Sequence, residues 1–500
     1  MVTIRQITNT PIEPGGETIS PKTFRLRTTQ CLVLGKYSTA RSYGLETLVL
    51  HLQSNLLGLV DSNINLWFLM GIIIRLAMRM GYHRDAGNYT SVSPFEGEMR
   101  RRVWAVIFQL DVLMSFQLGL PSMIPTDYCD TQPPKNLQFS DFSPSSGVLP
   151  PSRPLFDQTP ALYFIIKSRI MHVFKNIVAH TQSLTSPSLQ TTIMLDMEMR
   201  ETFASIPSDM KMRPVSQSFM DTPSKIMQRC SLELIYLKSI VVLNRRFLDR
   251  EAFDPKFTKF RSTCLDAAMQ ILARQADLHQ ACQPGGQLSN DKWMVLSLQA
   301  HDFLMAAMVV CLQLSVNMRT TAAGSRNAEF ERHFDALQTS QKIWSSTENS
   351  EAARTAAQAL ELMIRIIENR SVSNSGPSSQ LLHQDATFIP ELDIPYAEPM
   401  TEMIDGSENL DWVRTSVVDA SQKLSNTSDM ISIGVVRSVF LKLKRTQRDK
   451  SSIQQRKSRP RYFTKHGTGM DDLKRLAASV EGWLFLLLQK TAQGQKQFSF

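Results

Sequence analysis

Apolar residues that recur every three or four positions are the feature that most restricts the fold of this 500-residue chain. This spacing is typical of helices that bury one face, and it predicts helices over 45–60, 63–80, 94–118, 159–183, 188–205, 223–249, 257–282, 291–317, 328–345 and 350–368. The alternation of apolar and polar residues that indicates a strand is absent at comparable length, and no fixed repeat of 20 to 50 residues is present. We therefore expect an all-α protein built around one large multi-helix domain.

Three segments show the helical signals in detail. The segment 223–249 carries an apolar stripe of Leu232, Tyr236, Ile240, Leu243 and Phe247. The segment 63–80 is so apolar that we expect it to be largely enclosed, and Gly81 supplies its C-terminal stop. The third segment carries a longer stripe, made of Phe95, Met99, Val103, Ile107, Leu110 and Met114.

The ends of this third helix are also predictable. Ser93 offers an N-cap hydroxyl, Pro94 takes the first helical position and Glu96 the third, which is the pattern of a capping box. The sequence Gly119-Leu120-Pro121 predicts its end.

The tripeptide His83-Arg84-Asp85 raises the question of a protein kinase catalytic loop. Such a loop needs an asparagine after four intervening residues, because its aspartate orients the substrate hydroxyl while the asparagine holds magnesium. Thr90 occupies that position, no D-F-G follows, and no glycine-rich phosphate loop precedes the tripeptide. We therefore interpret these residues as a structural turn.

Other local signs of catalysis or metal binding are also missing from the sequence. We find no H-E-x-x-H, G-x-S-x-G, G-x-x-x-x-G-K-[ST] or D-D-x-x-D pattern, and the nine histidines have no partners at ligand spacing. The six cysteines lie far apart, which favours buried, reduced thiols over a local zinc site or a disulfide framework. We expect no catalytic residues, no bound cofactor and no metal ligands in this chain, and thus no enzyme.

The formal net charge of +9 is concentrated near the C-terminus. Eleven basic residues and a single acid lie between Arg437 and Lys465, so the remainder of the chain is nearly neutral. The candidate nuclear localisation residues are Lys442, Lys444, Arg445, Arg456, Lys457, Arg459 and Arg461. The alternative interpretation of this cluster is a solvated tail.

The preceding segment has the opposite composition. Residues 371–413 contain no Lys or Arg, and apolar residues are interleaved with eight acids: Asp385, Glu391, Asp393, Glu398, Glu402, Asp405, Glu408 and Asp411. This alternation is typical of transcriptional activation segments, in which the charges keep apolar groups solvated until a partner binds them. An ordinary acidic linker is the alternative.

These patterns predict four regions. They are a disordered N-terminus at 1–21, a helical domain at 22–370 with a loop at 136–158, an acidic and apolar segment at 371–430, and a basic tail at 431–500. We expect the Ser/Pro-rich stretch 140–154 to be exposed and both C-terminal segments to be disordered. The apolar runs 66–74 and 303–312 are too short to span a membrane, and no secretory signal is evident. An intracellular, soluble protein without a membrane partner is expected.

The order of these segments resembles the fungal-specific transcription factor domain, the middle homology region of fungal zinc binuclear cluster regulators. That family has an A-x-R-L-A helix, then G-L-H-R-D, then an E-x-x-R-R-x-W helix with a later aspartate, then G-R-P. The matching residues are His83, Arg84, Asp85, Glu98, Arg101, Arg102, Trp104, Asp111, Gly119 and Pro121. Tyr82 and Leu120 depart from the pattern, since they replace a leucine and an arginine. The strong match spans about residues 45–135, and a weaker one extends to about residue 370.

The resemblance implies an all-α regulatory domain in a nuclear transcription regulator that controls a metabolic or secondary-metabolite gene set. The family's zinc cluster needs C-x2-C-x6-C and a second such set, and these residues are absent here. Zinc would therefore be a cofactor only if an N-terminal cluster is missing from this chain. The implied partners are the transcription machinery or co-regulators, with DNA reached through a missing domain, the basic tail or a partner, and a homo- or heterodimer is also implied.

The charged residues of the 94–118 helix have two interpretations. Glu96 to Arg100 and Glu98 to Arg102 are spaced for ion pairs on the solvent-facing side, which would make the run of arginines a solvated face. Alternatively, Arg101 and Arg102 anchor the His83–Asp85 turn through charge-assisted hydrogen bonds to Asp85. In both cases the role is structural.

Two other hypotheses about function stay open on sequence grounds. One is a cytosolic helical scaffold, which deletion would reveal through unchanged transcripts and a diffuse cytoplasmic location. The other is an unrecognised helical enzyme, which a polar pocket with converging acid and base groups would indicate.

Overall fold

The structure, a computed structural model, describes residues 21–39, 43–56, 64–183, 188–248, 254–320, 327–347 and 351–373. Every regular element within these ranges is a helix and none is a strand, which confirms the predicted all-α class. Residues 1–20 and 374–500, which hold nearly all of the predicted N-terminal, acidic and basic regions, lie outside the described residues.

The first half of the described chain forms six α-helices and three short 3-10 turns. The α-helices are α2 (Pro21–Leu34), α3 (Gly44–Leu56), α4 (Ile64–Arg79), α5 (Pro94–Leu118), α6 (Leu162–Thr181) and α7 (Leu189–Ala204). The 3-10 turns are η1 (Ala86–Asn88), η2 (Thr126–Tyr128) and η3 (Phe139–Asp141).

The second half continues with five α-helices: α8 (Pro223–Asn244), α9 (Thr258–Ala281), α10 (Lys292–Thr320), α11 (Ala328–Ser345) and α12 (Glu351–Ser373). Four further 3-10 turns connect them: η4 (Ser208–Met210), η5 (Val215–Gln217), η6 (Arg245–Phe247) and η7 (Pro255–Phe257). The segments predicted as helices are therefore present, with ends that shift by a few residues.

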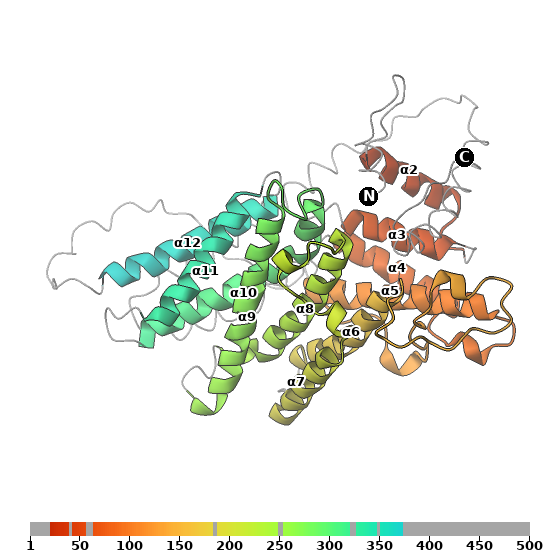
Figure 1. Cartoon of the computed structure of the whole chain (residues 1–500), viewed down its shortest axis with the longest axis horizontal. Helices are drawn as coiled ribbons and strands as arrows, with labels where there is room; N and C mark the ends of the chain where they lie inside the picture. Colours follow the sequence, from red (N-terminus) through yellow and green to blue (C-terminus); the bar gives the residue numbers. More distant parts are fainter. Residues whose placement is uncertain are drawn as a thin grey trace, which may run out of the picture.

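Helices that follow one another in sequence pack side by side through most of the molecule. The series runs from α2 through α3, α4 and α5 to α6, which packs on both α7 and α8, and continues through α9 and α10 to α11 and α12 (Figure 1). One continuous apolar core extends along this series from α3 to α12, and Leu52, Ile107, Phe174, Leu243 and Leu360 are fully enclosed in it. The α2–α4 layer and α12 therefore lie at opposite ends of one packed body.

The expectations about the α4 and α5 surfaces have different outcomes. The α4 helix is largely enclosed as expected, except along one face where Phe68 is 55% exposed and Ile72 37% exposed. In α5 the predicted stripe is not the buried face, because this helix contacts α4, α6 and η1 and is buried on several sides. Glu98 and Arg102, expected on the solvent side, are among its buried residues.

The predicted helix ends are confirmed where a special backbone conformation marks them. Gly81 and Gly119 have φ values of 80° and 69°, the left-handed region that glycine adopts without steric cost. Ser93 caps α5 through a hydrogen bond from the Glu96 N–H to its Oγ, at 3.2 Å, and Pro94 is the first helical residue. The Glu96 carboxylate, however, pairs with Arg100 Nη2 at 2.6 Å.

The loop that contains the Ser/Pro-rich stretch is fixed at its two ends. Asn136 is fully buried, and its Nδ2 donates to the carbonyl oxygens of Pro154 at 2.7 Å and Asp157 at 3.1 Å. Leu137 is also buried, whereas within 140–154 only Phe142 is buried and most side chains, including those of residues 143–145, 147–148 and 151–154, are exposed. The predicted exposure of the 140–154 stretch is therefore confirmed. No described helix is long and apolar enough to span a membrane.

Candidate functional site

Asp85 lies at the junction of three segments that carry the sequence motif. Arg101 on α5 donates from Nε to Oδ2 at 2.8 Å and from Nη2 to Oδ1 at 2.6 Å. The backbone N–H groups of Gly87 and Gln132 donate to the same carboxylate, each at 2.9 Å. The hydrogen bonds from Arg101 lower the Asp85 pKa to about 2 against the opposing effect of burial, and the two N–H groups add to this shift. The expected contact between Arg101 and Asp85 is therefore present.

A second aspartate, Asp130, holds the same turn from the other side. Its Oδ1 accepts the Asp85 N–H at 2.7 Å, and its Oδ2 accepts from Arg84 Nε at 3.1 Å. The Asp130 N–H in turn donates to the His83 carbonyl at 3.1 Å, and Thr131 Oγ1 donates to the Tyr82 carbonyl at 2.7 Å. The role of Asp130 was not predictable from local sequence patterns, because its partners lie more than forty positions upstream.

Arg102 does not contact Asp85, so this half of the expectation is wrong. Its Nε donates to Glu98 Oε1 at 2.8 Å inside the protein, and Phe139 and Phe142 lie against its guanidinium. The other Glu98 oxygen accepts the Lys135 N–H at 3.2 Å. Burial raises the Glu98 pKa, although Arg102 opposes this effect. The solvated-face interpretation fails for both Arg101 and Arg102.

Asp111 has the same role at the far end of α5. It is fully buried, and it accepts from Ser122 Oγ at 2.6 Å, the Met123 N–H at 3.1 Å and the Ile124 N–H at 3.2 Å. Lys175 on α6 donates to the Ile124 carbonyl at 2.5 Å. The connection that follows α5 is thus held against the helix soon after Gly119, at residues 122–124.

The other motif residues frame this turn. The His83 and Trp104 rings lie 6.4 Å apart, and Trp104 is buried. Arg84 is half exposed beside Asp130. Gly119 ends α5, and Pro121 follows in the connection to Ser122.

Taken together, the motif residues fix a connection that has little regular structure. Residues 122–137 run back beside α5, and Asp111, Asp85 and Glu98 accept N–H groups along it while Arg102 donates to the Leu137 carbonyl at 3.4 Å. These bonds satisfy backbone groups that would otherwise be buried without partners. Within the described ranges no cluster of His, Cys, Asp or Glu could hold a metal ion.

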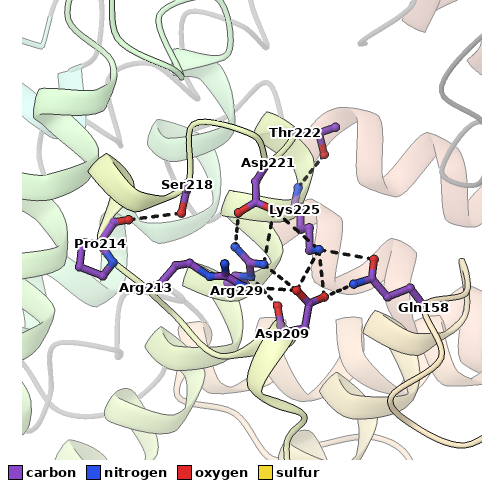
Figure 2. A network of polar contacts seen from close by, with 9 residues as sticks. All are labelled: Gln158, Asp209, Arg213, Pro214, Ser218, Asp221, Thr222, Lys225 and Arg229. Carbon is purple, nitrogen blue, oxygen red and sulfur yellow. Dashed lines mark hydrogen bonds and ion pairs between the residues drawn. The ribbon is translucent and has the colours of Figure 1, made fainter.

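A second polar cluster, which the sequence did not reveal, surrounds Arg229 on α8 (Figure 2). Arg229 is 1% exposed and donates from Nη1 to Asp221 Oδ2 at 2.5 Å and from Nε to the Asp209 carbonyl at 2.6 Å. Lys225 Nζ lies 2.9 Å from Asp209 Oδ2, and Gln158 donates to the same oxygen. The cluster therefore joins the end of the 136–158 loop to the start of α8.

The cations of this cluster outnumber its carboxylates. Arg213 adds a contact to Asp209 Oδ1 at 3.2 Å from a half-exposed position. Burial raises the pKa of Asp209, but the hydrogen bond from Lys225 and the charges of Lys225, Arg229 and Arg213 outweigh it and leave the pKa below its ordinary value. This arrangement favours salt bridges that are permanently formed.

A third charged pair crosses the core between α8 and α10. Lys238 Nζ lies 2.9 Å from both oxygens of Asp302, and both side chains are about 95% enclosed. Burial raises the Asp302 pKa, but the charge of Lys238 and the nearby His301 outweigh this effect and leave the pKa below its ordinary value. A lysine within the apolar run of α8 was the available sequence signal for this pair.

A cavity of about 460 Å³ lies between α11 and α12. Its lining includes Trp344, Arg354 and Glu361, none of which belongs to the motif. Glu361 is paired with Arg365 at 2.6 Å.

The fold and the motif together define an all-helical domain in which charged side chains fix irregular connections. Residues 50–250 match the model of the fungal specific transcription factor domain, so the chain carries a domain of this family. This finding confirms the resemblance that the motif residues suggested. The proteins of this family that match the chain are regulators and not enzymes, as expected.

Several curated relatives are similar over most of the chain. The Zn(2)-C6 fungal-type transcription factor pigI of Monascus ruber is 38% identical over 71% of this chain and 46% of its own length. The corresponding protein mpsB of Macrophomina phaseolina is 36% identical over 70% of this chain and 48% of its own. The equisetin cluster transcription factor of Fusarium heterosporum is 34% identical over 75% of this chain and 54% of its own length.

The chain thus spans about half the length of these relatives. No solved structure matches it.

Proposed function

We propose that this protein is a nuclear transcription regulator of the fungal zinc-cluster type that controls a secondary-metabolite gene set. The observation that carries the proposal is the similarity of 34 to 38% over 70 to 75% of the chain to three proteins named as transcription factors. One of the three is named for a metabolite cluster, the equisetin cluster. In this proposal the helical body is the regulatory part.

Deletion of the gene tests the regulatory role. We expect the transcripts of a group of biosynthetic genes to change, and reintroduction of the parent chain to restore them. A chain with Asp85→Asn is expected to restore them less well, because the turn that Arg101 and Asp130 hold would loosen. Unchanged transcripts in the deletion strain, together with a tagged chain spread through the cytoplasm, would point to a helical scaffold.

The basic segment is proposed to direct nuclear import. Alanine at Lys442, Lys444, Arg445, Arg456, Lys457, Arg459 and Arg461 should shift a fluorescently tagged chain from nucleus to cytoplasm. The matched control exchanges each Lys for Arg and each Arg for Lys, which keeps the charge and should keep most of the import. If the alanine variant stays nuclear, the segment is a solvated tail.

The acidic segment is proposed to recruit the transcription machinery. Residues 371–430 fused to a heterologous DNA-binding domain should activate a reporter, because their apolar groups can enter a partner's groove. Alanine at Phe388, Leu392, Tyr396 and Trp412 should abolish the activity while every acid is retained. A silent parent fusion would remove this part of the proposal.

DNA recognition is proposed to come from a zinc cluster encoded outside these 500 residues, from the basic segment or from a partner, in a homo- or heterodimer. Six cysteine codons at the C-x2-C-x6-C spacing upstream of Met1 in the genomic sequence would support the first route. Their absence would direct the search to co-purifying proteins.

A further inference from the structure

The exposed face of α4 combines apolar and basic side chains. Phe68, Ile72, Arg75 and Arg79 follow one another at spacings of four, three and four, so they form one stripe along the helix, and all four are exposed. No carboxylate pairs with Arg75 or Arg79 among the residues that the structure describes. A helix whose apolar composition suits enclosure thus has an uncovered face.

The neighbouring elements extend this character. The α2–α4 layer holds seven of the large apolar side chains that are exposed: Phe24, Leu26, Val33, Leu34, Tyr43, Phe68 and Ile72. Single exposed apolar residues are normal, so the ordered stripe on α4 is the feature that marks an interaction surface, and the other exposed residues add apolar character to the same layer.

The charge of the α2–α4 layer restricts which kind of partner can bind it. Its described side chains include five basic ones, Arg25, Arg27, Lys36, Arg75 and Arg79, and a single acid, Glu46. Glu46 accepts a hydrogen bond from Tyr82 at 2.9 Å. A partner with apolar groups and closely spaced carboxylates would complement this surface, whereas a basic or purely polar one would not.

We propose that this α2–α4 surface binds the acidic segment of the same chain, residues 385–411. That segment has the complementary composition, with eight acids, no Lys or Arg, and apolar residues between the acids. The proposal rests on its composition and not on its proposed role in activation, so the two can fail separately.

The connection is long enough for this contact. The described helices end at Ser373 on α12, at the opposite end of the body from α4 (Figure 1). A domain of about 350 residues has a radius of gyration of about 20 Å. An extended chain from Ser373 to Glu398 reaches about 85 Å, and to Asp411 about 130 Å. Both lengths exceed this radius at least fourfold, so the connection allows the segment to reach α4.

Zero-length crosslinking of the full chain tests the proposal. Arg79→Lys places an amine in the stripe without changing its charge, and a carbodiimide then joins this amine to any carboxylate in direct contact. We expect mass spectrometry to find residue 79 linked to residues between 385 and 411. The matched control is Arg332→Lys, on an exposed part of α11, which should give no such link. Absence of the residue 79 link, or an equal yield at residue 332, would overturn the proposal.

Two further experiments test whether the apolar side chains make the contact and whether the contact forms within one chain. Phe68→Ser with Ile72→Ser should lower the yield of the residue 79 link about tenfold, because the loss of apolar burial amounts to at least 1.4 kcal/mol. An unchanged yield would mean that nonspecific charge attraction accounts for the link. Mixing chains labelled with ¹⁴N and ¹⁵N separates the sources: links within one label support the proposal, and links between labels assign the surface to a second copy and overturn it.

Discussion

Asp85 shows how much structure one carboxylate can organise. Its two oxygens accept hydrogen bonds from Arg101, Gly87 and Gln132, and both Asp85 and Arg101 are largely enclosed. Removing one charge from such a pair leaves the other without compensation, and this costs more than the pair itself contributes. The His83–Asp85 turn, which resembles a kinase motif, therefore has a structural role and holds neighbouring segments together.

Replacing Asp85 by Asn should lower the free energy of unfolding by about 3 kcal/mol, because Arg101 loses its ionic partner. Glu96→Gln is the matched control, since it breaks the exposed pair with Arg100 and should cost less than about 1 kcal/mol. Chemical denaturation of the full chain, followed by circular dichroism, measures both. Equal losses of unfolding free energy for the two variants would show that the buried pair of Asp85 and Arg101 contributes no more to stability than the exposed pair of Glu96 and Arg100.

The lowered pKa of Asp85 also predicts a dependence on pH. Because this pKa is about 2 in the folded chain and ordinarily 3.8, the folded state favours the charged carboxylate. The stabilisation is complete above about pH 4 and is lost as the pH falls towards 2. The difference in unfolding free energy between the parent and Asp85→Asn should therefore shrink between pH 4 and 2, and a constant difference would contradict the ionic account.

At the scale of elements, α5 determines the course of the connection that follows it. Asp111, Asp85 and Glu98 accept backbone N–H groups of residues 123, 124, 132 and 135, which belong to no regular element. Such hydrogen bonds protect amides from exchange as a helix or sheet does.

Asp111→Asn should accelerate hydrogen exchange at Met123 and Ile124 by about tenfold or more, since hydrogen bonds to a charged acceptor contribute about 1.5–3 kcal/mol. The amides of Gln132 and Lys135 should keep their rates, because different carboxylates hold them. Asp127→Asn, in a turn without a side-chain cap, is the control and should change neither pair. Uniform acceleration along 122–137 would show that the connection opens as one unit.

The elements themselves were largely predictable from sequence, and their environments were not. Ser93, Gly81 and Gly119 marked helix ends correctly because capping depends on neighbouring residues. The α2 helix went unpredicted because its apolar residues do not gather on one face. The buried pair of Glu98 and Arg102 was placed in solvent, since local spacing does not reveal that the 136–158 loop covers it.

At the scale of the whole molecule, buried charges connect helices that are distant in sequence. Lys238 and Asp302 join α8 to α10, while Arg229 joins α8 to the connection between α7 and α8. Periodicity predicts which face of a helix is apolar, but not which helix will face it. These buried ion pairs could therefore be assigned only from the structure.

A double-mutant cycle tests the core pair. Lys238→Met should lower the free energy of unfolding by about 3 to 5 kcal/mol, because Asp302 then loses the lysine and keeps only the longer contact to His301 Nδ1 at 3.7 Å. Adding Asp302→Leu should recover most of this loss, since the double variant contains no buried charge. Losses that simply add would show that the two side chains do not act as a pair.

The connection along α5 has a consequence for how sequences in this family can diverge. Most of its hydrogen bonds to α5 come from main-chain atoms, which are the same in every residue except proline. Substitutions other than proline at positions 123, 124, 132 and 135 can therefore accumulate without releasing the segment, provided that the four α5 and turn side chains and the Asp130 carboxylate stay. Relatives should accordingly superimpose in this region even where their sequences no longer align.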